Sequence, residues 1–149
     1  MITADQLEIG ESPFGISPQA IDLHATLARA ASNDRPVYIK GNRGTGKGLA
    51  AQTIHKLSNR ESGPFQSVDL SRLTPSDQAN ILFDDTAERP ALTRATKDGT
   101  LYISMISHAT DTVQNLLHEW LLSEPTTRLI CGFTPDLSSS ETDGRVRLD

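Results

Sequence analysis

The sequence has little cysteine and no long apolar stretch. Its one cysteine, Cys131, excludes an intrachain disulfide framework and a zinc site built from several cysteines. No apolar run approaches the roughly 18 residues that a membrane-spanning helix needs, and the first residues lack the pattern of a signal peptide. We therefore expect a cytoplasmic domain that makes no contact with a membrane.

An excess of positive charge is also missing. The chain has 14 Lys and Arg against 19 Asp and Glu, which gives a formal net charge of −5 at pH 7. A protein that binds DNA by itself normally presents a basic face to the phosphates. The composition therefore predicts no direct DNA binding by this chain. Its 149 residues are enough for one domain with its own core.

What the sequence does contain is an alternation of strand-like and helix-like patterns, which is typical of an α/β fold with a mainly parallel sheet. Strands are expected at residues 37–40, 65–70, 100–106 and 128–133. Helices are expected at residues 18–30, 49–57, 75–83 and 112–122, and the polar residues 84–99 are expected to form a loop. Such a chain places helices on both faces of the sheet.

A glycine-rich segment joins the first of these strands to the following helix. Gly41 and Gly46-Lys47 have the spacing of a phosphate-binding loop, in the strand–loop–helix context that such a loop requires. Glycines let the backbone amides converge on a phosphate, and the helix adds its unpaired first amides. The candidate nucleotide-binding residues are Gly41, Asn42, Arg43, Gly44, Thr45, Gly46, Lys47 and Gly48. Gly48 stands where a strict phosphate-binding loop has Ser or Thr, so no hydroxyl at this position can bind magnesium.

Several blocks together resemble the AAA+ domain of bacterial sigma-54-dependent transcription activators. The matching segments are Ile9-Gly10-Glu11-Ser12-Pro13, Gly41-x-x-Gly44-Thr45-Gly46-Lys47, Ile54-His55-x-x-Ser58-x-Arg60, Gly63-Pro64-Phe65, Leu82-Phe83, Gly99-Thr100-Leu101-Tyr102 and Asp136-Leu137. The resemblance implies a Rossmann-like P-loop NTPase core over residues 1–137, with residues 138–149 as a tail or a truncated continuation. It also implies ATP as ligand, with Ile9 and Gly10 near the base. Members of the family form rings, hydrolyse ATP between subunits and remodel the sigma-54 holoenzyme.

The chain departs from that family at its second nucleotide motif. The family's strand reads Gly-Thr-Leu-Phe-Leu followed by Asp-Glu, whereas this chain has Tyr102 at the phenylalanine and Ser104-Met105 at the two acids. In the family the first acid helps to hold the metal and the second polarises the attacking water. Loss of a general base alone lowers a rate by about 10²–10⁴. We expect no active ATPase and no catalytic residues, and substitution by Asp98 or Asp111 is disfavoured because both are expected beyond the strand ends.

Other family elements are altered as well. The sigma-contacting hexapeptide Gly-Ala-Phe-Thr-Gly-Ala has no counterpart between Phe83 and Gly99, and the polar residue that ends the last strand aligns with Thr134. Arg147 has two interpretations, a remnant of an arginine finger or a solvated tail residue, of which the second is favoured. No lid and no helix-turn-helix are expected in this chain.

The remaining candidates have simpler structural explanations. The four histidines lack metal-ligand spacing and are expected on helix surfaces, and Cys131 is expected to be a buried small hydrophobe. The stripe of Val113, Leu116, Leu117 and Trp120 is expected to be core or a subunit contact, and the acidic residues Asp84, Asp85 and Glu88 are expected in a solvated loop. No metal site is predicted.

These observations predict a nucleotide-binding, hydrolysis-deficient domain of a sigma-54-activator-type transcription regulator. ATP is the expected ligand, bound weakly, with magnesium undecided. An alternative is a non-catalytic module that associates with another AAA+ activator subunit and modulates it. A third possibility is an ATPase whose missing groups come from a partner. Nucleotide titration separates the first two hypotheses, and phosphate release tests the third.

Overall fold

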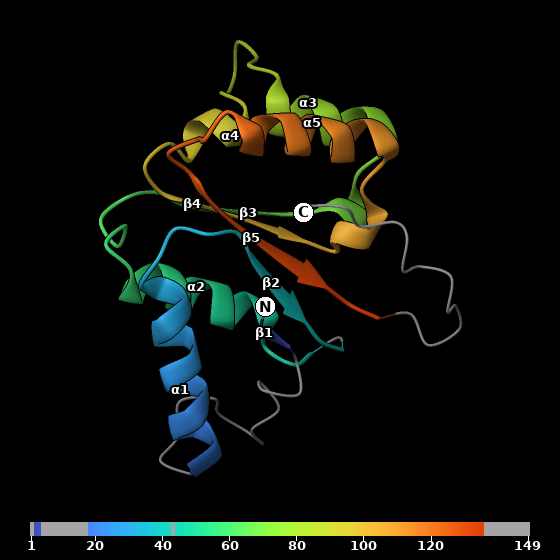
Figure 1. Ribbon diagram of the computed structural model, residues 1–149. Helices are drawn as coiled ribbons and strands as arrows, with labels where there is room; N and C mark the ends of the chain where they lie inside the picture. Colours follow the sequence, from blue (N-terminus) through green and yellow to red (C-terminus); the bar gives the residue numbers. More distant parts are fainter. Residues whose placement is uncertain (1, 4–17, 43, 136–149) are drawn as a thin grey trace.

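A computed structural model describes residues 2–3, 18–42 and 44–135 of the chain. They form a parallel sheet with the strand order β1-β2-β5-β4-β3 (Figure 1). The strands are β1 (Ile2–Thr3), β2 (Val37–Lys40), β3 (Phe65–Asp69), β4 (Thr100–Ser104) and β5 (Arg128–Phe133). Because all pairs are parallel, the carboxyl ends of β2, β5, β4 and β3 share one edge of the sheet, which we call the carboxyl edge, and the opposite edge is the amino edge.

Helices cover both faces of this sheet, as predicted (Figure 1). On one face lie α1 (Pro18–Ala31) and α2 (Lys47–Leu57), and on the other lie α3 (Pro75–Phe83), α4 (Leu92–Ala95) and α5 (Asp111–Leu122). Two short 3₁₀ helices, η2 (Leu70–Arg72) and η3 (Ile106–His108), follow β3 and β4. Among the described helices, none is long and apolar enough to cross a membrane.

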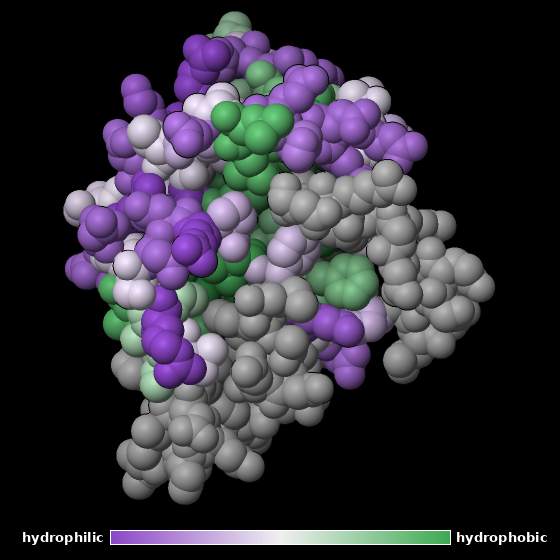
Figure 2. Space-filling view, in the orientation of Figure 1, coloured by the Kyte–Doolittle hydropathy of each residue, from purple (hydrophilic) through white to green (hydrophobic). Residues whose placement is uncertain are grey.

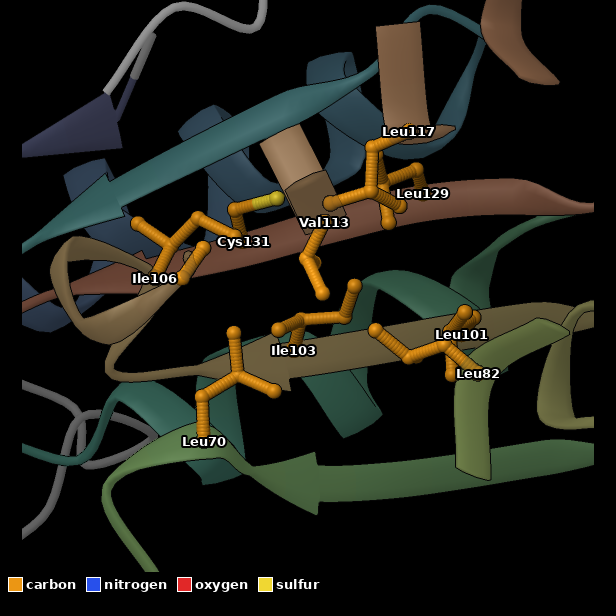
Figure 3. Packing of buried hydrophobic residues seen from close by; sticks show 10 residues of the cluster. Leu70, Leu82, Leu101, Ile103, Ile106, Val113, Leu117, Leu129 and Cys131 are labelled. Atoms are coloured by element: carbon orange, nitrogen blue, oxygen red, sulfur yellow. The ribbon is translucent and has the colours of Figure 1, made fainter. Parts of the chain in front are cut away.

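The pleat of β4 explains why the core has two halves. Successive side chains of a strand point to opposite faces. Accordingly, Leu101 and Ile103 pack beneath α5, together with Leu129 and Cys131 of β5 and Val113 and Leu117 of α5 (Figure 3). Tyr102 points to the other face and packs with Ile39, Ile130 and the small residues of α2. The residues of β4 that face α2 therefore lie on the side of the sheet where the glycine-rich loop enters its helix.

Local sequence signals account for the starts of the later helices. Thr74 caps α3 by accepting a hydrogen bond from the Asp77 amide at 3.2 Å, and Pro75 occupies the first turn. Thr110 caps α5 in the same way, through the Val113 amide at 3.1 Å. These side-chain caps satisfy amide groups that would otherwise have no intrahelical partner.

Three sequence-based predictions of local structure need correction. The predicted loop at 84–99 contains the short helix α4, whose first turn is closed by the bond from the Ala95 amide to the Ala91 carbonyl at 2.8 Å. The strand predicted at 100–106 ends at Ser104, because Met105 adopts a left-handed backbone with φ 56°. The edge strand β1 was not predicted, since two residues leave no periodic signal.

Candidate functional site

The glycine-rich segment forms a tight loop at the carboxyl edge of the sheet. It leaves β2 beside β5, where the Gly41 amide donates to the Phe133 carbonyl at 2.9 Å. Gly44 and Gly46 have φ values of +85° and +87°, which L side chains rarely adopt. A Cβ at either position would meet nothing within 4 Å, so backbone conformation rather than space requires glycine there.

The helix that follows this loop begins without a side-chain cap. Its N-cap residue is Gly46, and the first turn contains no acidic residue. The α3 and α5 helices, by contrast, are capped by threonine side chains. The first amides of α2 and the positive end of its dipole are thus available to an anion, which is the arrangement found at phosphate-binding helix termini.

Lys47 lies across the loop. Its ammonium group donates to the carbonyl oxygens of Gly41 at 2.8 Å and Asn42 at 2.9 Å. The Thr45 hydroxyl also donates to the Asn42 carbonyl, at 2.8 Å, and closes the turn between them. These bonds hold a positive charge at the mouth of the loop, where it can attract phosphoryl oxygens.

The end of β4 carries no carboxylate. Ser104 is the last residue of the strand and is half-buried, and Met105 follows it with φ 56° and ψ 47°. A hydroxyl and a thioether do not supply the charged oxygen ligands that magnesium prefers. Within the part of the chain that the structure describes, no group of three or more His, Cys, Asp and Glu side chains is placed to hold a metal ion. Ser104 and Met105 therefore do not supply the acidic pair that the resemblance implies beside a magnesium ion.

The sequence analysis missed Asp69, which brings a carboxylate close to this position. Asp69 ends β3 directly beside Ser104 in the parallel register. Its Oδ1 atom accepts hydrogen bonds from the Ser71 amide at 2.9 Å and the Ser71 hydroxyl at 2.6 Å, and its Oδ2 atom lies 3.5 Å from the Arg72 side chain. Asp69 is thus occupied as the cap of η2. Its place at the end of a strand next to β4 is the sequence signal that could have identified it.

Tyr102 is the second residue whose position was not foreseen. Its ring crosses from β4 towards α2 and β5, where a Cβ at Gly132 would lie 2.5 Å from the phenolic oxygen. Burial, with smaller contributions from Cys131 and Asp69, raises the pKa of Tyr102 to about 12. The phenol therefore stays protonated over the whole physiological range.

The remaining predicted site residues are placed as follows. Thr134 comes directly after β5 at the same edge as Gly41 and is half-exposed. Ile9, Gly10, Arg43 and Arg147 lie outside the described residues. Asp98 precedes β4 and Asp111 opens α5, so neither ends a strand beside Ser104.

At the amino edge, the His-x-x-Ser-x-Arg block has a structural explanation. The prediction that the histidines lie on helix surfaces is wrong for His55, which is only 7% exposed. Its Nδ1 atom lies 2.8 Å from the Thr100 hydroxyl and its Nε2 atom 3.2 Å from the Gly63 carbonyl, and the ring packs at a tilt against Phe65. Burial lowers the pKa of His55 more than the Gly63 carbonyl raises it.

Ser58 and Arg60 complete this amino-edge network. The Ser58 hydroxyl donates to the His55 carbonyl at 2.7 Å and accepts from the Arg60 amide at 3.1 Å. The Arg60 guanidinium then donates to the Thr126 carbonyl and to the Asp34 carboxylate, the latter at 3.1 Å. The block thus connects the loops at the starts of β2, β4 and β5. None of the bonds just described reaches the phosphate loop.

Two further candidates behave as core or surface residues. Cys131 is 1% exposed, and burial raises the pKa of its thiol, so it is a small hydrophobe as predicted. The acidic residues after α3 are exposed, and Asp85 binds the Ala91 amide at 2.8 Å and Arg94 at 3.3 Å. These bonds fold residues 85–94 back on themselves.

Comparison with known proteins indicates the family to which this fold and loop correspond. The family model described as "Sigma-54 interaction domain" matches residues 14–147. The chain is 28% identical over 162 residues to the Psp operon transcriptional activator of Escherichia coli strain K12, covering 95% of this chain and 50% of that protein. It is 29% identical over 157 residues to the Nif-specific regulatory protein of Rhodobacter capsulatus, covering 91% of this chain and 27% of that protein. The chain thus spans half or less of these relatives.

Solved structures agree with this assignment. The structure of NtrX from Brucella abortus in complex with ATP superposes with a TM-score of 0.78 at 26% identity, over 95% of this chain and 36% of that one. The P-loop NTPase domain of a sigma-54 activator from E. coli gives a TM-score of 0.64 at 25% identity, over 83% and 80% of the two chains. The match to the family model, together with a P-loop fold of this topology, shows that the chain belongs to the sigma-54 interaction domain family of AAA+ proteins.

Proposed function

We propose that this domain binds an adenine nucleotide at the phosphate loop and acts in transcriptional control without hydrolysing it. The observation that carries the proposal is the combination of two features at one edge of the sheet. The left-handed Gly44 and Gly46 and the uncapped start of α2 form an anion site. The adjacent end of β4 has no acid. The ATP complex of NtrX, a relative in structure, supports adenine nucleotide as the ligand.

In this proposal the phosphates are held by the loop from Gly41 to Gly48, with Lys47 as the charged contact. Thr134 lies at the same edge and offers a hydroxyl, while Ile9, Gly10 and Arg43 are assigned to the site only by resemblance to the family. Hydrolysis needs a group that orients and activates water, and the thioether of Met105 cannot accept a proton. Ser104 adds a hydroxyl but no charge.

The segment after α3 supports a role other than direct activation. In place of a protruding sigma-contacting loop, residues 85–94 are closed by the Asp85 bonds, and the Thr93 hydroxyl donates to the Leu82 carbonyl at 2.7 Å. A segment held in this way has no free hexapeptide to offer to a sigma factor. We therefore expect neither binding to sigma-54 holoenzyme nor activation of transcription by this chain alone.

Calorimetric titration with ATP tests the binding. Wild type is expected to bind at micromolar to millimolar concentration, and Lys47→Ala is expected to abolish the signal because it removes the charge at the mouth of the loop. Lys56→Ala is the matched control, since Lys56 is an exposed lysine in the last turn of the same helix. Identical flat thermograms for wild type and Lys47→Ala at millimolar ATP would rule out nucleotide binding.

Phosphate release tests the second half of the proposal. The purified chain is expected to release phosphate from ATP no faster than a blank without protein, with and without magnesium. Robust turnover that disappears in Lys47→Ala would show that another group activates water, and the proposal of a hydrolysis-deficient domain would then be wrong.

A second candidate function is association with an intact activator subunit. Of the two interpretations of the α5 stripe, core or subunit contact, burial supports the core for Val113 and Leu117. The end of the same helix is different, since Leu122 is 70% exposed, and in Figure 2 hydrophobic residues form a strip from α5 towards the sheet within a hydrophilic face. Co-sedimentation with an intact activator domain, compared between wild type and Leu122→Ser, tests this candidate. This candidate would be eliminated if a several-fold excess of this chain neither co-sedimented with the intact domain nor changed the ATPase rate of that domain.

A further inference from the structure

Arg128 is a buried cation at the amino edge of the sheet. It is the first residue of β5, is 1% exposed, and its backbone amide donates to the Gly99 carbonyl at 2.9 Å. Leu129 and Cys131 pack on the α5 side of the sheet, and Ile130 packs with residues of α1 and α2. Because side chains alternate along a strand, Arg128 points to the same face as Ile130. The fold thus buries a guanidinium group that is charged at every physiological pH.

This guanidinium group has more donors than the acceptors around it can use. Its Nε atom donates to the Arg35 carbonyl at 3.2 Å, in the loop between α1 and β2. Within the part of the chain that the structure describes, neither Nη1 nor Nη2 of Arg128 has a hydrogen-bond partner, although both atoms are buried. Buried polar groups nearly always bond an acceptor. The Nη side of Arg128 is therefore where we expect an additional acceptor.

The neighbouring charges indicate that this acceptor is an anion. The Asp34 side chain is 60% exposed, and its carboxylate bonds Nε of Arg60 at 3.1 Å. The Arg60 side chain is 15% exposed, and its Nη1 atom lies 3.4 Å from the Gly99 carbonyl that also binds the Arg128 amide. Burial lowers the pKa of Arg128 more than Asp34 raises it, and Arg60 lowers it further.

Two guanidinium groups in this cluster thus share the carboxylate of Asp34, and one of the two is almost fully buried. Buried charges in proteins are normally paired, because removing a charge from water is costly. A water molecule could accept hydrogen bonds from Arg128, but it supplies no negative charge. An anion meets both requirements.

The burial of Arg128 also limits the size of this anion. Residues 32–36 form the loop that contacts its Nε atom, and each of them is exposed. Local opening of a surface loop admits a small ion, whereas a nucleotide or a protein segment would have to displace the loop permanently. The paired Nη atoms form a planar fork that matches the two oxygens of a carboxylate group.

We propose that Nη1 and Nη2 of Arg128 bind a small carboxylate anion at the amino edge, beside the ion pair of Asp34 and Arg60. The anion accepts the N–H groups that have no partner among the described residues, and it balances the second positive charge of the cluster. Phosphate-loop binding takes place at the opposite edge of the sheet, so this site goes beyond the proposed function and does not depend on it. A bound anion stabilises the folded state according to its concentration and affinity.

Urea denaturation of the full chain tests the site, with acetate replacing gluconate at constant ionic strength. Gluconate carries the same carboxylate group on a chain too long for a buried site. We expect acetate to stabilise the folded wild type along a saturating curve, which gives a dissociation constant. Arg128→Gln should raise this constant about tenfold, because it removes the charged fork. Arg35→Gln is the matched control, since it removes the same charge from an exposed residue and should leave acetate affinity unchanged.

A second variant leaves Arg128 in place, in case Arg128→Gln does not fold. Asp34→Asn removes the carboxylate that bonds Arg60 and would repel a second anion. We expect Asp34→Asn to bind acetate several-fold more tightly than wild type. Saturation-transfer NMR of the acetate methyl group measures this affinity without unfolding the protein.

Three results would overturn the proposed anion site. The first is a wild type that acetate stabilises no more than gluconate does, which would mean that water or Asp34 itself meets the Nη atoms. The second is a folded Arg128→Gln variant with the acetate affinity of wild type. The third is an Asp34→Asn variant that binds acetate no more tightly than wild type. None of these results affects the ATP titrations, and an absence of ATP binding would leave the anion site intact.

Discussion

The two edges of the sheet differ in how closely they follow the family to which the chain belongs. At the amino edge, His55, Ser58 and Arg60 match the block on which the resemblance rests. His55 and Arg60 bond neighbouring segments, and Ser58 joins these two residues. At the carboxyl edge, the phosphate loop matches the family, but Ser104 and Met105 stand where the resemblance implies two acids. The resemblance is therefore close at one edge, and at the other we propose that the groups needed for hydrolysis are missing.

This difference indicates which residues of the family pattern stabilise the fold. The amino-edge residues hold the starts of the strands together through bonds that need no nucleotide. At the other edge, Ser104 ends and Met105 follows a strand that is paired on both sides in the sheet, although neither residue is acidic. A match to the family over residues 14–147 therefore indicates the fold and does not by itself indicate hydrolysis.

The largest effect is expected for stability at the amino edge, from the substitution Gly99→Ala. A Cβ there would overlap the carbonyl oxygen of Pro64 and lie 2.7 Å from its ring Cδ atom, and Gly99 also accepts from the Arg128 amide at 2.9 Å. We expect a loss of about 3 kcal/mol in the free energy of unfolding, measured by urea denaturation.

Gly48→Ala at the carboxyl edge is the matched substitution. The nearest atom to its Cβ lies 3.9 Å away, and alanine favours a helix over glycine by about 0.5–1 kcal/mol. It should leave stability unchanged or slightly higher. Equal losses in the two variants would show that the edges do not differ in the way that their contacts indicate.

A smaller effect, on ATP binding, is expected when acids are introduced at the end of β4. The double variant Ser104→Asp and Met105→Glu supplies charged oxygen ligands beside the loop. We expect magnesium to strengthen ATP binding by the double variant about tenfold, or about 1.4 kcal/mol, and to strengthen binding by the wild type less. Titrations with magnesium and with EDTA measure this. If magnesium strengthens ATP binding no more in the double variant than in the wild type, these two acids are not sufficient to form a magnesium site.

The smallest effect concerns the titration of His55. Burial holds its pKa below the ordinary value of 6.5 in the folded state. The unfolded chain therefore binds this proton first as pH falls, and stability is full above about pH 6.5 and decreases below it. Urea denaturation between pH 8 and pH 5 should show a decrease that His55→Gln lacks. His118→Gln, at an exposed position of α5, should retain the wild-type pH dependence.

Much of the fold was predictable because its signals are local. The spacing of Gly41, Gly46 and Lys47 between a strand and a helix fixes a loop conformation that only glycine adopts at two positions. The apolar run of β5 and the alternation in α5 likewise reflect burial by a sheet and by one helix face. Parallel topology then follows from the alternation of the elements.

What the sequence did not reveal depends on residues that meet only in space. The burial of His55 arises from Gly63, Phe65 and Thr100, which come from other elements. Asp69 acquires its place beside Ser104 through strand register, and Tyr102 owes its position to Gly132, 30 positions along the chain. No periodicity within one segment carries such information.

The fit between Tyr102 and Gly132 also fixes the order in which the site can change. Alanine at Gly132 would place a Cβ 2.5 Å from the phenolic oxygen, whereas the closest ring carbons lie at 3.2 Å. Once Tyr102 is phenylalanine, only the tight but tolerable ring contacts remain. If both positions change by single substitutions, Tyr102→Phe therefore has to precede Gly132→Ala, because the reverse order passes through a destabilised intermediate.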